Sequence, residues 1–232
     1  YTHMVFRGWY DFGGGAMADM AHYSLWTVFN ELELSGPTRI EPMLSHDTEL
    51  RNNVAARIRN DYSFPAAGVV RFRYPARGWR PTVDLVWYEG GIRPPRPEEL
   101  EEDNKEMPAE GVMFVGDKGK ILAGFYMSDP RLIPERRMRA FAPETRPQPQ
   151  QTRIGSISPG MQAWIGACRG GAPSPANFLN AGPISEAVNL YAVAYRAGAP
   201  LTYDPASGTI TSPREANQYL TREYRKGWEI PA

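Results

Sequence analysis

The chain has little cysteine, no long apolar run and no excess of charge of either sign. Cys168 is the single cysteine among 232 residues, so an internal disulfide framework is excluded, while the redox compartment stays undecided. No segment approaches the roughly 18 consecutive apolar residues of a membrane span, so we expect no membrane-spanning helix. The 26 Lys and Arg residues balance the 26 Asp and Glu residues. A nucleic-acid or anionic-membrane partner, which would require a basic excess, is therefore not expected.

Glycine and proline, in contrast, are abundant. The chain holds 22 of each, whereas the two together make up roughly 12% of an average protein. This composition predicts a loop-rich domain with long connections rather than a helical bundle. One such connection is the segment rich in proline and glutamine at 143–151. The opening residues 1–4 have no signal-peptide character, and the chain is expected to be a fragment of a longer protein.

The most informative stretch runs from Phe12 to Tyr23 and reads FGGGAMADMAHY. Its three glycines allow backbone with positive φ and close approach to another chain segment or a ligand. The residues after them predict a helix from about Ala16 to Leu32. Within it, Asp19 and the residues three and four positions later project to one side of the helix. Polar groups on so apolar a helix are costly to bury, so they should either satisfy one another or face a cleft.

Patterns elsewhere predict an α+β domain over residues 1–232. Alternation of apolar and polar residues predicts two paired strands at 66–74 and 82–88. The sequence Gly-Asp-Lys-Gly, set between two apolar runs, predicts a second hairpin at 111–124. Its lysines also suit a phosphate-binding loop, but neither Gly-Lys-Ser/Thr nor a helix follows, which favours a plain turn. The acidic, proline-rich segment 89–110 is expected to be a surface loop or an arm over a partner subunit.

Later elements complete the expected fold. Residues 39–48 look extended, residues 52–65 look irregular, and two short strands are expected near 201–203 and 208–211. Helices are expected from Ser158 to Cys168 and from Pro183 to Gly198, with a last one from Ser212 that closes near Gly227.

These elements predict a mainly antiparallel or mixed sheet with helices on one face. The strands carry several large apolar residues, namely Val69, Phe72, Leu85 and Trp87. Because the expected helices are too few to cover both faces, the open face is expected to meet a second subunit in a homodimer or homotetramer.

Four stretches together resemble the Gfo/Idh/MocA oxidoreductases, the glucose–fructose oxidoreductase and inositol dehydrogenase group. They are Trp9–Ala21, Gly111–Gly124, Trp164–Gly171 with Asn177-Phe178 and Ala181–Pro183, and Arg222–Glu229. The match covers nearly the whole chain in order, which is more specific than any one motif.

The resemblance implies that this chain is one half of a two-domain enzyme. Family members have an N-terminal Rossmann domain that binds NAD or NADP, followed by an α+β domain that supplies the substrate site and oligomer contacts. This chain is similar to the second domain only. It has no strand followed by G-x-G-x-x-G and a helix, and no counterpart of the family's catalytic lysine in Glu-Lys-Pro. The fragment is expected to be inactive alone and to bind no cofactor by itself.

The resemblance also implies a catalytic role for the helix after the glycines. The family commonly has Asp-x-x-x-His there, close to the nicotinamide and the sugar. Asp19 matches the aspartate, but Tyr23 takes the place of the histidine and His22 lies one residue earlier. An imidazole with a pKa near 6.5 relays protons at neutral pH, whereas a phenol with a pKa near 10 mostly donates a hydrogen bond. The alternative is that Asp19 and His22 merely bond each other at an interdomain seam.

Further residues are expected around this helix. The resemblance implies a place beside the cofactor for Gly13, Gly14 and Gly15. An aromatic face and a fork of donors suit a sugar, which gives a substrate-binding set of Arg7, Trp9, Tyr10, Arg169 and Asn177. Core packing explains Trp9 equally well. No metal site is expected, because the three histidines are scattered and Asp19 with His22 provides too few ligands.

Three functions remain open at this stage. The leading one is the substrate domain of an NAD(P)-dependent oxidoreductase that acts on a sugar or cyclitol hydroxyl or ketone. The second is a glycosidase or lyase that uses bound NAD transiently, and the third is a carbohydrate-binding domain without catalysis. The sequence decides neither the substrate, nor NAD against NADP, nor a cytoplasmic against a periplasmic location.

Overall fold

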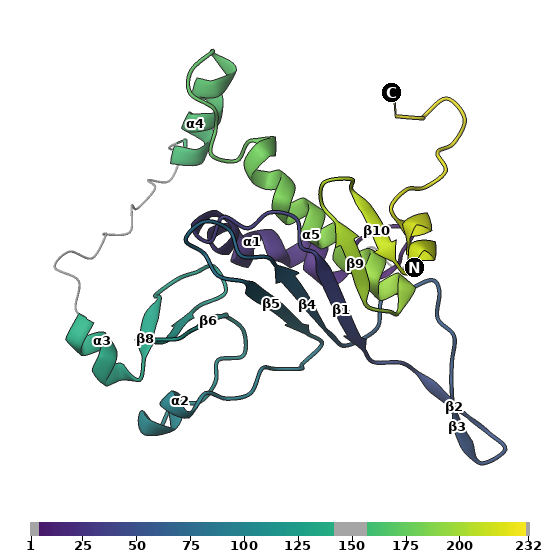
Figure 1. Cartoon of the computed structure of the whole chain (residues 1–232), viewed down its shortest axis with the longest axis horizontal. Helices are drawn as coiled ribbons and strands as arrows, with labels where there is room; N and C mark the ends of the chain where they lie inside the picture. The colour runs from purple at the N-terminus through teal and green to yellow at the C-terminus, as the bar shows by residue number, and fades with distance from the viewer. Residues whose placement is uncertain (1–4, 142–156, 231–232) are drawn as a thin grey trace. The chain divides into compact units, whose positions relative to one another are not determined.

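A computed structural model describes residues 5–141 and 157–230. The segments 1–4 and 143–151, on which two of the expectations above fall, lie outside these residues. The chain divides into two compact units, one made of residues 1–94 with 183–232 and the other of residues 95–182. Helices and open antiparallel sheets occur together (Figure 1), so the fold class is α+β, as predicted.

The first unit is built on a five-stranded antiparallel sheet in the order β10-β9-β1-β4-β5. Its strands are β1 (Arg39–Leu44), β4 (Gly68–Tyr74), β5 (Val83–Glu89), β9 (Leu201–Asp204) and β10 (Thr209–Ser212). The pairing of β4 with β5 confirms the predicted hairpin, and β9 and β10 confirm the two predicted short strands.

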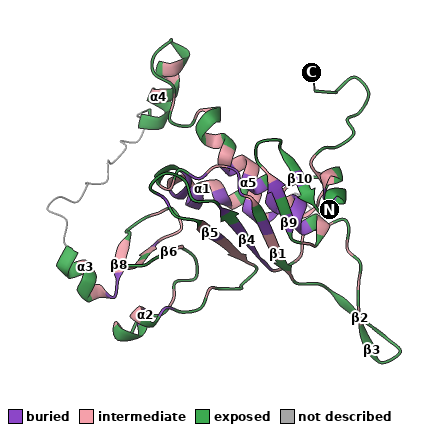
Figure 2. Cartoon of the chain, viewed as in Figure 1, coloured by how far each residue is buried: buried purple, intermediate pink, exposed green. Residues whose placement is uncertain are grey.

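Two helices pack on the same face of this sheet. They are α1 (Gly15–Glu31) and α5 (Phe178–Ala197), of which the residues from Pro183 onward belong to the first unit. The ring of Phe29 in α1 meets Tyr74 of β4 edge-on at 5.8 Å between centroids. The hydroxyl of Tyr203 in β9 donates to Glu186 of α5 at 2.7 Å. Figure 2 shows the buried residues concentrated in these helices and strands.

The alternation in β4 explains which face is covered. Val70, Phe72 and Tyr74 are fully buried, whereas the arginines between them are exposed. Phe72 lies opposite Leu85 in the register, so both contribute to the core beneath the helices.

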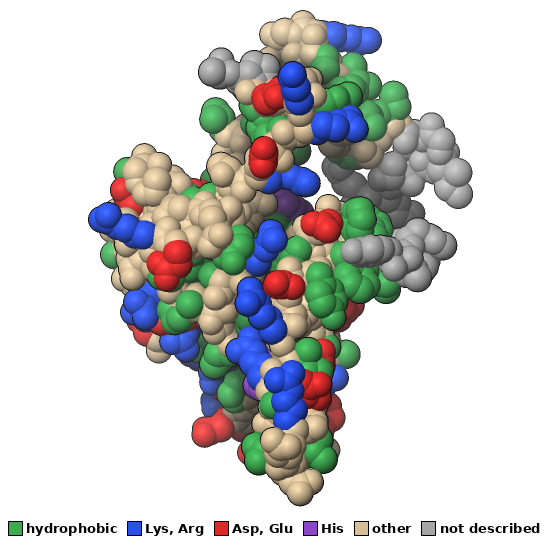
Figure 3. All heavy atoms as spheres, turned by 90° about the vertical axis from the view of Figure 1, so that its right-hand side faces the viewer, with side chains coloured by type: hydrophobic (Ala, Val, Ile, Leu, Met, Phe, Trp, Pro, Cys, Tyr) green, Lys and Arg blue, Asp and Glu red, His purple; other side chains and the backbone are tan. Residues whose placement is uncertain are grey.

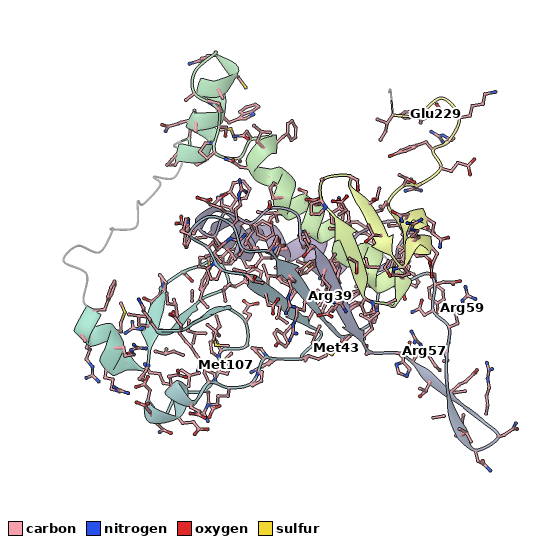
Figure 4. The ribbon with its side chains drawn as sticks, in the orientation of Figure 1. Arg39, Met43, Arg57, Arg59, Met107 and Glu229 are labelled. Carbon is pink, nitrogen blue, oxygen red and sulfur yellow. The ribbon has the colours of Figure 1, made fainter. Side chains whose placement is uncertain are left out.

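The other face of the sheet is mixed in character. Arg73 pairs with Asp84 at 2.9 Å, and Arg39 pairs with Glu41 at 2.7 Å. Met43, which follows on the same face of β1, is 67% exposed, and Figure 4 labels it together with Arg39. The sheet face that the helices leave uncovered therefore carries charged pairs near Arg39 and an exposed apolar side chain, Met43, at the other end of β1.

Helix α1 matches its predicted range because its apolar residues recur at helical spacing. Met17, Ala21, Leu25 and Val28 are all buried, which places one stripe against the sheet. Leu32 caps the C-terminal end, before Gly36 and Pro37 turn the chain.

A two-stranded hairpin, β2 (Thr48–Arg51) with β3 (Val54–Arg57), extends from the first unit. The prediction that residues 52–65 are irregular was wrong for 54–57. Asn52 and Asn53, with φ of 50° and 63°, make the tight turn that such a hairpin requires. Nearly all of its residues are exposed, so no apolar alternation marked it as a strand.

Basic side chains gather on the face of the molecule that carries this hairpin (Figure 3), and Arg57 and Arg59 lie near its base (Figure 4). Several of these arginines have acidic neighbours. Arg51 pairs with Glu49, and Arg59 lies 3.7 Å from Asp61. Acidic side chains therefore offset part of the positive charge around this hairpin.

The second unit contains a three-stranded antiparallel sheet in the order β6-β7-β8. Its elements are α2 (Glu98–Glu102), β6 (Val112–Gly116), β7 (Gly119–Ala123), β8 (Arg131–Ile133), α3 (Glu135–Phe141) and α4 (Pro159–Cys168). The predicted Gly-Asp-Lys-Gly hairpin is confirmed as β6 and β7, and a strand rather than a helix follows it. Helix α4 begins where it was predicted, and the side chain of Ser158 accepts from the Met161 N–H and caps it.

Two boundaries were predicted wrongly. Helix α5 begins at Phe178 rather than Pro183, because Asn177 caps it: its Oδ1 accepts from the backbone N–H groups of residues 179 and 180. The expected last helix is only a 3-10 helix, η2 (Arg214–Tyr219), with no side-chain cap. The Asn217 amide instead bonds the backbone of Ile210 and Arg214, which holds this segment to β10. No helix among the described residues is long and apolar enough to cross a membrane.

Candidate functional site

The glycine run folds back on the segment before it and thereby positions Arg7. That segment includes a short 3-10 helix, η1 (Phe6–Gly8). A side chain on Gly13 would lie 2.5 Å from the Cα of Arg7, so only glycine permits this approach. The N–H of Gly13 also donates to the carbonyl of Trp9 at 3.0 Å. The fold-back places the residues of η1 beside the first turns of α1.

Arg7 and Asp19, predicted separately as a substrate-binding and a catalytic residue, form an ion pair. The Arg7 Nη1 lies 2.8 Å from the Asp19 Oδ2, and their side chains are 51% and 42% exposed. The carboxylate is thus oriented by a guanidinium but still open to a ligand. An exposed pair of this kind adds little stability, about 0–1 kcal/mol, so its position matters more than its energy.

Gly15 begins α1 with φ of +78°, a conformation that other residues adopt only with strain. A side chain there would lie 2.8 Å from the Phe64 ring and 2.9 Å from the Tyr191 hydroxyl. Gly15 therefore lets the start of the helix lie directly against these two aromatic residues. The close approaches of Gly13 and Gly15 are to the chain's own atoms, and these account for both glycines without a cofactor. The role of Gly13, Gly14 and Gly15 beside a cofactor stays a prediction.

A cavity of about 230 Å³ lies at this junction. Its lining comprises Val5, Arg7, Gly8, Gly15, Ala16, Phe64, Pro65, Ala66, Glu89 and Gly90. The volume is below the roughly 300–1,000 Å³ of sites for drug-sized ligands. The cavity therefore suits a small molecule of about the size of one sugar ring. Arg7 lines this cavity and also pairs with Asp19.

Glu89 gives this cavity a negative charge and was not among the predicted site residues. Its Oε1 accepts from the Tyr191 hydroxyl at 2.7 Å, and its Oε2 accepts from the Trp87 Nε1 at 2.9 Å. A local signal existed: Leu85, Trp87 and Glu89 alternate along β5 and share the face that α1 and α5 cover. A carboxylate at the inward position of a strand is unusual unless it is paired or functional.

The tyrosines around Glu89 remain neutral hydrogen-bond donors. Burial, together with the charge of the Glu89 carboxylate and its hydrogen bond, raises the pKa of Tyr191 well above its ordinary value. Burial and the nearby charge of Glu89 raise the pKa of Tyr195, whose ring centroid lies 4.1 Å from that of Tyr191. At neutral pH the cavity thus has an acceptor at Glu89 that the protonated phenol of Tyr191 and the Trp87 indole hold in place.

The other two residues predicted to be catalytic, His22 and Tyr23, lie on α1 as well but differ in burial. The His22 Nε2 lies 3.4 Å from the Ser185 Oγ of α5, and the imidazole is half-buried between the helices. Tyr23 is 57% exposed. Asp19 bonds Arg7 and His22 bonds Ser185, so these contacts do not support the alternative in which the aspartate and the histidine merely bond each other.

Trp9 and Tyr10 belong to an aromatic layer next to the cavity. Trp9 stacks on Tyr62 at 5.8 Å, and Tyr10 packs against Phe64 at 4.5 Å between ring centroids. Burial raises the pKa of Tyr10 to about 12, against the opposing effect of the Arg196 guanidinium, which lies 5.2 Å from its ring centroid. This arrangement supports the packing explanation for Trp9. Phe64, which lines the cavity, also packs on Tyr191.

Arg169 and Asn177 lie in the second unit. Arg169 caps the C-terminal end of α4, and the Asn177 side chain caps α5 through its Oδ1. The Asn177 amide nitrogen also donates to the Ser174 carbonyl at 2.8 Å. Local helix capping thus accounts for Asn177 without a ligand.

No cluster of three or more His, Cys, Asp or Glu side chains in the described part of the chain is arranged to hold a metal ion. No protein-family model matches the chain, and a search of curated proteins finds no significant match. The resemblance to the Gfo/Idh/MocA oxidoreductases therefore depends on the sequence motifs quoted above alone.

Proposed function

We propose that this chain is the substrate-binding half of an NAD(P)-dependent oxidoreductase of the Gfo/Idh/MocA type. The substrate is a sugar or cyclitol, oxidised at a ring hydroxyl or reduced at a ring ketone. The observation that carries the proposal is the half-exposed Arg7–Asp19 pair beside a sugar-sized cavity with a carboxylate in its lining. The bound nicotinamide, held by an N-terminal domain outside this chain, supplies the hydride chemistry.

Each side chain has a definite role in this proposal. Asp19 accepts a hydrogen bond from the reacting hydroxyl, and Arg7, whose Nη1 lies 2.8 Å from the Asp19 Oδ2, holds the carboxylate in position. Tyr23, one helical turn further on, donates to a neighbouring oxygen of the substrate. His22 is a positioning residue, because its bond to Ser185 joins α1 to α5. The principal acid and base is the lysine of the family's Glu-Lys-Pro motif, which has no counterpart in this chain.

The direct test uses the protein that contains this chain. It is assayed with NAD⁺ and NADP⁺ against a panel of sugars and cyclitols, and the absorbance of the reduced nicotinamide is followed. Asp19→Asn should lower kcat by about 10²-fold or more, the usual contribution of a positioned acid–base group. Asp11→Asn is the matched control, since it makes the same change on an exposed carboxylate at the start of the same glycine segment.

Two results would reject the proposal. One is that no sugar or cyclitol reduces either cofactor, and the other is that Asp19→Asn behaves like Asp11→Asn. Cleavage of a glycoside without accumulation of reduced cofactor would favour the redox-assisted glycosidase or lyase. Sugar binding that survives Asp19→Ala and His22→Ala unchanged would favour a carbohydrate-binding domain without catalysis.

A further inference from the structure

The charges around the cavity beside Gly15 do not balance. Among the described residues, Arg7 and Glu89 are the two charged ones in its lining, and the Arg7 guanidinium is already paired with Asp19 at 2.8 Å. The three groups together carry one net negative charge. The nearby Arg196 does not compensate it by contact, because its guanidinium is placed between the rings of Tyr10 and Tyr219, at 5.2 Å and 4.9 Å.

Glu89 is fixed in position but not saturated. It accepts one hydrogen bond at each oxygen, from Tyr191 and from Trp87. A carboxylate has about four acceptor sites, so roughly two remain for a ligand. Because a partly buried charge is costly without hydrogen-bond partners, a ligand that donates to Glu89 is stabilised and a ligand anion is repelled.

Resting on the proposed function of this site, we propose that Glu89 determines which sugars enter the cavity. It accepts hydrogen bonds from donor groups without negative charge, namely the hydroxyls of an uncharged sugar or the ammonium group of an amino sugar, and it excludes sugar acids. Glu89 is thus a specificity-determining residue.

The test compares three ligands that share one ring and differ in charge. Binding of glucose, glucosamine and glucuronate to the full chain is measured by isothermal titration calorimetry at neutral pH. Glucuronate should bind at least about tenfold more weakly than the other two. In Glu89→Gln, which keeps the shape and removes the charge, most of this discrimination should disappear.

Glu186→Gln is the matched control. Glu186 also accepts from a tyrosine hydroxyl at 2.7 Å, that of Tyr203, and it is half-buried like Glu89, but it does not line the cavity. This variant should keep the ligand order of the original chain. Circular dichroism of each variant checks that the fold is retained.

Several outcomes would overturn the inference. Glucuronate binding equal to or tighter than that of glucose would do so, as would a ligand order in Glu89→Gln that matches the original chain, because the carboxylate would then only hold Tyr191 and Trp87. Absence of binding for all three ligands would also overturn it. The cofactor-reduction assay described above decides the oxidoreductase proposal independently of these results.

Discussion

Gly15→Ala should destabilise the start of α1, because Gly15 combines a positive φ with close contacts to two aromatic side chains. The added Cβ would require φ near +78°, where a non-glycine residue costs about 1–2 kcal/mol. It would also lie 2.8 Å from Phe64 and 2.9 Å from the Tyr191 hydroxyl, an overlap that costs about 1–3 kcal/mol to relieve. The sum is about 2–5 kcal/mol.

The assay is thermal unfolding combined with hydrogen exchange of peptides from α1. For a chain of this size, about 2–5 kcal/mol lowers Tm by roughly 4–20 °C, and exchange should increase most in residues 15–23. Hydrogen exchange is needed because a chain with two compact units does not have to unfold in one step. Gly8→Ala is the control, because nothing lies within 4 Å of its added Cβ. A Tm for Gly15→Ala equal to that of Gly8→Ala would refute the described packing.

Three further results are expected. Tyr191→Phe removes a donor to Glu89 at 2.7 Å and should cost about 1–3 kcal/mol in urea unfolding; no change would mean that water replaces the phenol. The hydrogen bond from Arg73 lowers the pKa of Asp84 below 3.8. The ion pair therefore adds at most about 1 kcal/mol to the free energy of unfolding above pH 3.8, and this stabilisation is lost as the pH falls through the pKa of the folded state. Asp84→Asn should remove this dependence of stability on acid pH. Light scattering should show a dimer or tetramer that Met43→Glu weakens, whereas a monomer at micromolar concentration would contradict assembly through the open sheet face.

The elements that the sequence predicted well are those with a strong local pattern. Helix α1 has a buried stripe from Met17 to Val28, strands β4 and β5 alternate, and Gly-Asp-Lys-Gly is typical of a hairpin. The elements that were missed lack such a pattern. The β2–β3 hairpin is exposed on both faces, and only Asn52-Asn53 could have indicated its turn. Helix α5 was started too late because Pro183 was taken as its first residue, although Asn177 offered an earlier cap.

The candidate site was predictable only in part, for a similar reason. The polar residues at the start of α1 were expected either to satisfy one another or to face a cleft. In the structure Asp19 pairs with Arg7 and is half-exposed, and Tyr23 is exposed. Glu89 and Tyr191 are 102 positions apart in the sequence. A local sequence pattern cannot predict a hydrogen bond between residues so far apart. The ion pair between Arg7 and Asp19 could not be predicted either, because it forms only when the glycine segment folds back on Arg7.

The central claim is that the cavity at the start of α1 binds a small polyol. Backbone amide resonances of the chain, followed by NMR during titration with glucose and with myo-inositol, test this most directly. We expect saturable shifts for at least one of the two ligands, concentrated at Gly8, Gly15, Ala16, Ala66 and Gly90. Unchanged resonances at these five residues, or shifts confined to residues outside the cavity lining, would contradict it.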